Sequence, residues 1–260
     1  MKIDETVTAK FIQTNSKEEN RNSKAYDSSK IIWKQADIIE KTDDYLLHTA
    51  LDLVNGSRLL VKRYFHGDLF SKEIEITRNL NHRNILMQIF SDDLSIYSEL
   101  PSNGSIKQEL KTFGKLNENL IRKIVIQILD ALKYLHSQGI AHLGIISSNI
   151  FRDSYGTVKV SNFNKSKNFL IKKGRYLPGG EDFFKRDFFT LALLIMEMLT
   201  GKIGYDIHDD HYATCHYIDY SLNNIEGLSS DIKSFLTILR NINSLEKFKI
   251  NKLINHPYLS

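Results

Sequence analysis

In the second half of the chain, one long helical segment with apolar side chains on nearly every face constrains the fold most. It covers about residues 187–200, with the sequence DFFTLALLIMEMLT, and Gly201 follows it. Such a helix has no face suited to water, so other elements must surround it. A second segment, 117–138, has apolar residues at helical spacing between a capping residue, Asn117, and Gly139. This half is therefore predicted to be a helical layer around the 187–200 helix.

The first part of the chain has the pattern of strands instead. Two apolar runs, 45–51 and 59–62, flank a link that contains Asn55-Gly56, which predicts a β-hairpin. Residues 70–80 are predicted to form a helix, and 94–100 another strand before a Pro-Ser-Asn-Gly break. Further strands are predicted at 149–151 and 157–160, and further helices at 187–200, 229–241 and 247–254.

Three parts follow from this order of elements. Residues 1–30 are polar, with few apolar side chains to bury, and are predicted to be a flexible tail. Residues 31–100 are predicted to form a strand-rich lobe, and 101–260 a mostly helical lobe. The fold class is therefore α+β, which still leaves several folds open.

Composition excludes some classes of function. The net charge of +4 is too small to favour a nucleic-acid partner. No apolar run is long enough for a membrane span, since the longest, 188–199, is short and contains Glu197. The single cysteine, Cys215, has no partner for an internal disulfide, which favours an intracellular location, cytoplasmic or nuclear.

A stretch in the second half carries a specific resemblance. Residues 133–167 have the sequence KYLHSQGIAHLGIISSNIFRDSYGTVKVSNFNKSK. This resembles the catalytic core of the eukaryotic protein kinases, where an HRD motif, a metal-binding Asn and a DFG motif follow one another at this spacing. The residues in those three positions are, in order, His142-Leu143-Gly144, Asn149 and Asn162-Phe163-Asn164. The resemblance implies a bilobal protein-kinase-like fold, with a small β-rich N-lobe and a larger helical C-lobe.

The resemblance extends to both sides of that stretch. Lys62 stands where kinases have the strand lysine that holds nucleotide phosphates, and Glu73 where they have the helix glutamate that pairs with it. These two residues, with Asn149, could form a residual nucleotide site. A structural ion pair for Lys62 and Glu73, and a loop-capping role for Asn149, remain open alternatives. The residues expected to support the core are His142, Phe163 and Asp187.

The departures from the kinase pattern fall on the catalytic positions. Gly144 replaces the aspartate that accepts the proton of the substrate hydroxyl, and it has no side chain. Asn162 replaces the metal-binding aspartate of the DFG motif, and a neutral amide oxygen is a weaker magnesium ligand than a carboxylate. Asn164 replaces the glycine of that motif. No catalytic residue and no metal site are therefore expected.

The nucleotide-binding parts differ as well. The segment 40–45, where the resemblance places a glycine-rich loop, has no glycine and carries three acidic residues. Leu60 and Phe151 stand where kinases leave space for adenine. ATP binding is accordingly expected to be weak or absent.

A basic cluster follows the DFG position. Its members are Lys165, Lys167, Lys172, Lys173 and Arg175. It is a candidate docking site for an acidic or phosphorylated protein partner. The alternative is an ordinary solvated loop.

The hypothesis that these features favour is a pseudokinase, a scaffold or allosteric regulator that binds a signalling protein, for which an active protein kinase is one candidate. It would be no enzyme, and would bind neither nucleic acid nor membrane. A second hypothesis is a weak or unorthodox nucleotide-dependent transferase that uses Lys62, Glu73, Asn149 and Asn162. A third is a ligand-gated switch resembling the mixed-lineage-kinase-like pseudokinases.

Overall fold

The computed structural model describes residues 33–172, 175–176, 180–203, 211–242 and 250–260. The predicted tail, 1–30, lies outside these ranges. Within them the chain divides into two compact units, each described here by itself. The first comprises the described residues up to Arg78 together with Leu86–Leu100, and the second comprises Asn79–Ile85 and the chain from Pro101 onward. No helix in the described ranges combines the length and the apolar character that a membrane crossing requires.

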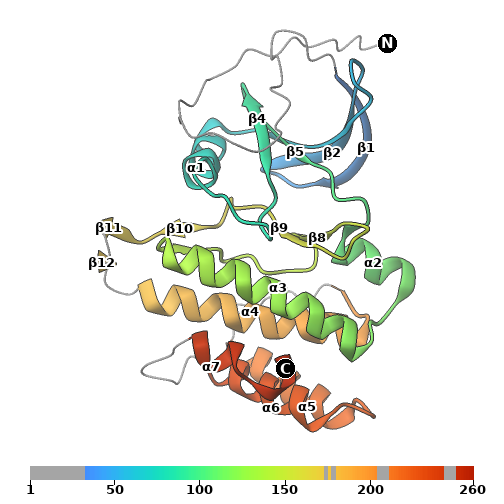
Figure 1. Ribbon diagram of the computed structural model, residues 1–260, viewed down its shortest axis with the longest axis vertical. Helices are drawn as coiled ribbons and strands as arrows, with labels where there is room; N and C mark the ends of the chain where they lie inside the picture. The colour runs from blue at the N-terminus through green and yellow to red at the C-terminus, as the bar shows by residue number, and fades with distance from the viewer. Residues whose placement is uncertain (1–32, 173–174, 177–179, 204–210, 243–249) are drawn as a thin grey trace. The chain divides into compact units, whose positions relative to one another are not determined.

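The first unit is an antiparallel five-stranded sheet with one helix (Figure 1). The strand order is β1-β2-β3-β5-β4, and α1 covers Gly67–Thr77. The strands are β1 (Trp33–Lys41), β2 (Tyr45–Asp52), β3 (Arg58–Tyr64), β4 (Gln88–Asp92) and β5 (Ser95–Glu99). The predicted hairpin is β2–β3, and its turn contains Gly56 at a φ of 74°.

The central strand β3 is buried on both faces of this sheet. On one face Leu59 and Val61 join an aromatic core in which the rings of Phe90 and Tyr97 stack 4.1 Å apart. Because side chains alternate along a strand, Leu60, Lys62 and Tyr64 lie on the other face. The register therefore places a lysine in a buried, largely apolar layer.

The second unit is mainly helical. Figure 1 shows α3 and α4 running side by side, with α5, α6 and α7 beyond α4. The helices are α2 (Ile106–Phe113), α3 (Glu118–Ser137), α4 (Gly180–Thr200), α5 (His211–Asn224), α6 (Ser230–Arg240) and α7 (Ile250–Ile254), followed by a 3-10 turn (Pro257–Leu259). As predicted, α4 is buried on nearly every side, from Asp187 to Leu199.

The boundaries of α3 follow from its sequence. The Asn117 side chain accepts a hydrogen bond from the backbone N–H of Leu120, and Gly139 has a φ of 75°, which favours glycine at a helix end. The predicted range of 117–138 thus holds to within a residue at each end. The 187–200 prediction was too short at its start, since α4 begins at Gly180.

Short strands connect the helices. A three-stranded sheet has the order β6-β8-β9, in which β8 and β9 form a hairpin that turns at Gly156, with a φ of 82°. Two further pairs are β7 with β10 and β11 with β12. The bounds are β6 (Gly104–Ser105), β7 (Ile140–Ala141), β8 (Ile150–Arg152), β9 (Val158–Val160), β10 (Lys167–Asn168), β11 (Leu170–Lys172) and β12 (Arg175–Tyr176).

Candidate functional site

Lys62 and Glu73 form a buried ion pair in the first unit. The Lys62 Nζ lies 2.6 Å from Glu73 Oε2, and the two residues are only 7% and 5% exposed. β3 supplies the lysine and α1 the glutamate. Burial lowers the pKa of Lys62, while the Glu73 carboxylate opposes this shift. The structure therefore joins the two residues that the sequence paired.

Two tyrosines enclose this ion pair. The Tyr64 hydroxyl donates a hydrogen bond to the same Oε2 of Glu73, and burial raises the pKa of that hydroxyl. The Lys62 Nζ lies 4.4 Å from the ring centre of Tyr45 and 4.7 Å from that of Tyr64. An ammonium near aromatic faces is stabilised by the ring quadrupoles. Sequence reasoning missed this enclosure, because it depends on the register that places Tyr45 opposite Tyr64.

The turn between β1 and β2 stands where the resemblance places the glycine-rich loop. The N–H of Thr42 donates to the carbonyl of Tyr45, which closes the chain into a tight turn without glycine. The Tyr45 hydroxyl donates to Glu40 Oε2 over 2.8 Å. The Glu40 and Asp44 carboxylates act on Lys62 in the direction that raises its pKa. The turn is thus short and acidic, as its sequence indicated.

In the second unit, Asn149 and Asn162 lie within hydrogen-bonding distance. The Asn162 Nδ2 donates to Asn149 Oδ1 over 3.0 Å, and Asn149 Nδ2 donates to the carbonyl of Gly144 over 2.9 Å. Asn162 has a φ of 64°, a left-handed conformation that asparagine tolerates better than most residues. The three motif positions are therefore brought together, and both asparagine amides take part in hydrogen bonds.

Asp187 holds the loop that precedes Gly144. Its carboxylate accepts hydrogen bonds from the backbone N–H groups of His142, at 2.9 Å, and Leu143, at 2.6 Å. Its Oδ2 also lies 2.8 Å from Nε2 of His136. Leu143 has a φ of 59°, which costs about 1–2 kcal/mol for a side chain of this kind. The two hydrogen bonds that the Asp187 carboxylate accepts offset this strain and hold the loop in place.

The remaining motif residues line the same part of the second unit. The Phe163 ring packs edge-on against the His142 ring at 4.7 Å, and His142 Nε2 lies 3.1 Å from the carbonyl of Ser161. Asn164 is half-buried and follows them in a turn. These contacts suit the supporting role predicted for His142 and Phe163.

The structure places only part of the basic cluster. Lys165 and Lys167 are exposed, and Lys167 Nζ lies 4.4 Å from the ring centre of Phe183. Lys173 lies outside the described residues, as do the side chains of Lys172 and Arg175. Docking at this cluster stays a prediction.

Comparison with known proteins finds similarity to protein kinases. Residues 58–177 match the family model described as the protein kinase domain. Mitogen-activated protein kinase kinase kinase A of Dictyostelium discoideum is 27% identical over 273 residues, covering 92% of this chain and 29% of that protein. Mitogen-activated protein kinase kinase kinase 3 of Homo sapiens is 35% identical over 153 residues, covering 50% of this chain and 24% of that protein. The chain thus spans less than a third of these curated relatives.

A solved structure supports the predicted fold. Rad53 in complex with AMP-PNP superposes with a TM-score of 0.67 at 21% identity, covering 88% of this chain and 65% of that chain. The α+β, protein-kinase-like fold, with a β-rich N-terminal part and a larger helical C-terminal part, is confirmed.

The predicted function, a pseudokinase without enzymatic activity, is contradicted by these relatives. The sequence favoured a catalytically inactive scaffold or allosteric regulator, not an enzyme, with ATP binding weak or absent, whereas relatives from Dictyostelium discoideum and Arabidopsis thaliana that cover most of this chain are named mitogen-activated protein kinase kinase kinases. The physical reason is that the prediction was based on the missing carboxylates at Gly144 and Asn162, whereas other parts of the kinase pattern are retained in the structure. The Lys62–Glu73 pair is formed, and the asparagines retain oxygen atoms beside the loop.

Proposed function

Because this chain is a relative of the eukaryotic protein kinases, we propose that it is a nucleotide-dependent transferase that uses ATP and magnesium to phosphorylate a protein. The residues that carry this role are those of the second hypothesis: Lys62, Glu73, Asn149 and Asn162. Phosphoryl transfer requires positioning and charge neutralisation more than covalent chemistry by the protein. An enzyme with weakened parts can therefore retain a low rate.

The observation that carries the proposal is the Lys62–Glu73 pair. A lysine held by a buried glutamate at 2.6 Å is oriented before any nucleotide arrives. In the kinase family this pair must be in place for activity. Lys62 would contact the phosphates of ATP, and Glu73 would position Lys62.

The asparagines fit a magnesium ion only weakly. Mg²⁺ prefers oxygen ligands and is usually held by one or two carboxylates together with substrate phosphates. Asn149 and Asn162 offer amide oxygens, and Oδ1 of Asn149 already accepts a hydrogen bond from Asn162. When bound, the ion would neutralise charge on the phosphates. Because both protein ligands are neutral, we expect the enzyme to need more magnesium than one with a carboxylate.

The rate is expected to be low. Gly144 cannot accept a proton, and a positioned general base typically contributes about 10²–10⁴-fold. Without it, the substrate hydroxyl would lose its proton to water or to a phosphate oxygen. Slow transfer is therefore part of the proposal.

The substrate is proposed to be another protein inside the cell. By their names, several relatives act on a mitogen-activated protein kinase kinase. A protein kinase is thus the first candidate substrate or partner for this chain. The single cysteine supports an intracellular setting, cytoplasmic or nuclear.

The test is a phosphoryl-transfer assay with radiolabelled ATP on the purified chain, with magnesium or manganese and a generic protein substrate. We expect slow transfer that Lys62→Met abolishes and that Lys34→Met, at an exposed position on β1, leaves unchanged. Calorimetry with ATP on the same samples separates binding from turnover. Absence of both ATP binding and transfer in the wild-type chain would contradict the proposal.

A further inference from the structure

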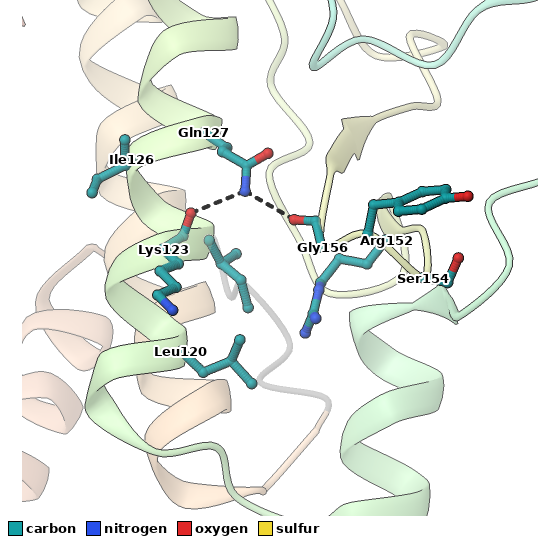
Figure 2. A pocket seen from close by; sticks show the side chains of 9 residues that line it. Leu120, Lys123, Ile126, Gln127, Arg152, Ser154 and Gly156 are labelled. Atoms are coloured by element: carbon teal, nitrogen blue, oxygen red, sulfur yellow. Dashed lines mark hydrogen bonds between the residues drawn. The ribbon is translucent and has the colours of Figure 1, made fainter.

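A groove in the second unit lies apart from the candidate catalytic positions. It has a volume of about 570 Å³ and lies between α3 and the β8–β9 hairpin. Figure 2 shows Leu120 and Lys123 on the helix and Arg152 extending from the hairpin on the other side, while Ile126 lies on the side of the helix away from the hairpin. None of its lining residues is Gly144, Asn149 or Asn162. The groove is therefore separate from the residues proposed for phosphoryl transfer.

The wall of this groove is ordered by a single side-chain amide. Gln127 Nε2 donates to the carbonyls of Lys123, at 3.2 Å, and Gly156, at 3.0 Å (Figure 2). Its Oε1 accepts from the backbone N–H of Val158 and from Nδ2 of Asn84, each at 2.9 Å. The amide thus fills its hydrogen-bonding capacity while tying the helix to the hairpin. The groove exists before any ligand binds.

Two cations face the groove. Lys123 is exposed and makes no ion pair with any residue in the described ranges. The Arg152 side chain is 12% exposed and donates through Nη1 to Glu109 Oε2 at 2.9 Å. Its Nε is buried and has no hydrogen-bond partner among the described residues. Arg152 is thus already paired with a carboxylate and its unused donor is buried, so Lys123 is the cation that a ligand can reach.

The nearby carboxylates make contacts of their own, although the buried Oε1 of Glu109 has no hydrogen-bond partner among the described residues. Glu109 is held by Arg152, and the Asp153 Oδ1 accepts from the backbone N–H groups of Tyr155, at 2.9 Å, and Thr157, at 2.8 Å. These bonds stabilise the charged form of Asp153 and lower its pKa, although burial opposes them. The cation of Lys123 is left without a carboxylate of the described chain beside it, so the groove favours an anionic ligand.

Apolar side chains flank the same cations. Ile126 is 40% exposed and Tyr155 is 94% exposed, and both line the groove together with the half-buried Leu120. Single exposed apolar residues are ordinary, whereas a group of them around one groove marks a binding surface.

We propose that this groove binds an acidic peptide segment of a partner protein. A glutamate or aspartate of the segment pairs with Lys123, while an adjacent aliphatic side chain packs on Leu120 and Ile126. Charge complementarity selects the occupant: an anionic group suits the unpaired cation of Lys123, and the apolar surface favours a peptide over a ligand that is charged throughout. The proposal concerns binding alone, so it stands or fails independently of phosphoryl transfer.

The test measures the binding of a fluorescein-labelled peptide of alternating glutamate and leucine to the full chain by fluorescence anisotropy. We expect saturable binding that weakens with added salt, and that the Lys123→Glu/Ile126→Asp variant weakens about tenfold or more. Lys133→Glu is the matched control, because Lys133 is exposed on the same helix and does not line the groove. It should bind as the wild type does, and circular dichroism should show all variants folded.

Two further ligands test whether binding requires the carboxylates and whether a nucleic acid competes for the groove. A peptide of alternating glutamine and leucine should bind far more weakly, since it lacks the carboxylates. A single-stranded oligonucleotide should fail to displace the acidic peptide. Equal binding by the double variant and the wild type, displacement by the oligonucleotide, or no binding by the wild-type chain would each overturn the proposal.

Discussion

The amide nitrogen of Asn162 donates a hydrogen bond to Oδ1 of Asn149 over 3.0 Å. The same oxygen also accepts a hydrogen bond from the Ser148 hydroxyl at 3.5 Å, so a cation would have to compete with both donors. The bond between the two asparagines depends on the amide of Asn162, since a carboxylate in its place could not donate. The two positions that would hold magnesium are thus coupled by one of the substitutions that distinguish this chain from the kinase pattern.

The Asn162→Asp variant should therefore bind magnesium more tightly. It adds a negative charge and removes the donor to Asn149 Oδ1. The attraction between a dication and one carboxylate at 4 Å is about 2 kcal/mol even in water, which corresponds to about thirtyfold in affinity. The measurement is the magnesium concentration that gives half-maximal transfer, with Asn164→Asp as the charge-matched control. A magnesium dependence equal to that of the wild type would contradict this interpretation.

The Gly144→Asp variant should accelerate transfer by about 10²–10⁴-fold, because it supplies the missing general base. The backbone tolerates a side chain there, because Gly144 has no positive φ, but a Cβ at position 144 would lie 3.2 Å from Nδ2 of Asn149, so that amide must shift by a few tenths of an ångström. Gly144→Asn has the same size without the basicity and should leave the rate near that of the wild type. Equal rates for the two variants would show that the proton is not limiting.

Removing one member of the Lys62–Glu73 pair should destabilise the first unit. Lys62→Met leaves Glu73 buried with the Tyr64 hydroxyl but without its cation, at a cost of about 3–5 kcal/mol in the free energy of unfolding. The double variant Lys62→Met/Glu73→Leu removes both charges and should recover most of that loss. Urea unfolding at neutral pH measures both. A single variant as stable as the wild type would mean that the carboxylate is not strongly desolvated.

Asp187→Asn should loosen the loop at 142–144. The amide keeps one acceptor but places a donor against a backbone N–H, and each hydrogen bond to a charged group contributes about 1.5–3 kcal/mol. We expect a loss of about 3 kcal/mol in stability and faster amide hydrogen exchange at His142 and Leu143. Arg186→Ala, at the exposed neighbouring position, should change stability by less than about 0.5 kcal/mol. Unchanged exchange at both amides would argue against Asp187 as their anchor.

His48 should make stability depend on pH. The ring is 1% exposed and stacks on Trp33 at 5.9 Å, and burial lowers its pKa from 6.5. The folded state therefore resists protonation, so its full stability is present above pH 6.5 and is lost as the pH falls through and below that value. His48→Gln should flatten this part of the curve of unfolding free energy against pH. An equally steep decline in the variant would assign the dependence to other groups.

The helices around α4 could be predicted because their apolar residues recur at helical spacing over long stretches. α5 was missed, since His211–Asn224 has few strongly apolar residues and begins in a polar segment. β1 was missed for a related reason: apart from Trp33, this edge strand is largely exposed and lacks an alternating pattern. Elements that bury few side chains show only a weak periodic pattern of apolar residues in the sequence.

The residues of the candidate site could likewise be predicted only in part. The partners Lys62 and Glu73 could be named from the motif, but the tyrosines around them depend on strand register, which one sequence does not fix. The groove joins residues of α3 to the β8–β9 hairpin through contacts between distant segments. The prediction of inactivity was based on the absent carboxylates, and relatives named as protein kinases contradict it.

The hydrogen bonds of Gln127 have a consequence for kinetics. Since that amide already joins the helix to the hairpin, an arriving peptide meets a surface that does not have to rearrange. Association should then be limited by diffusion and orientation, and peptides of different strength should differ mainly in how long they remain bound.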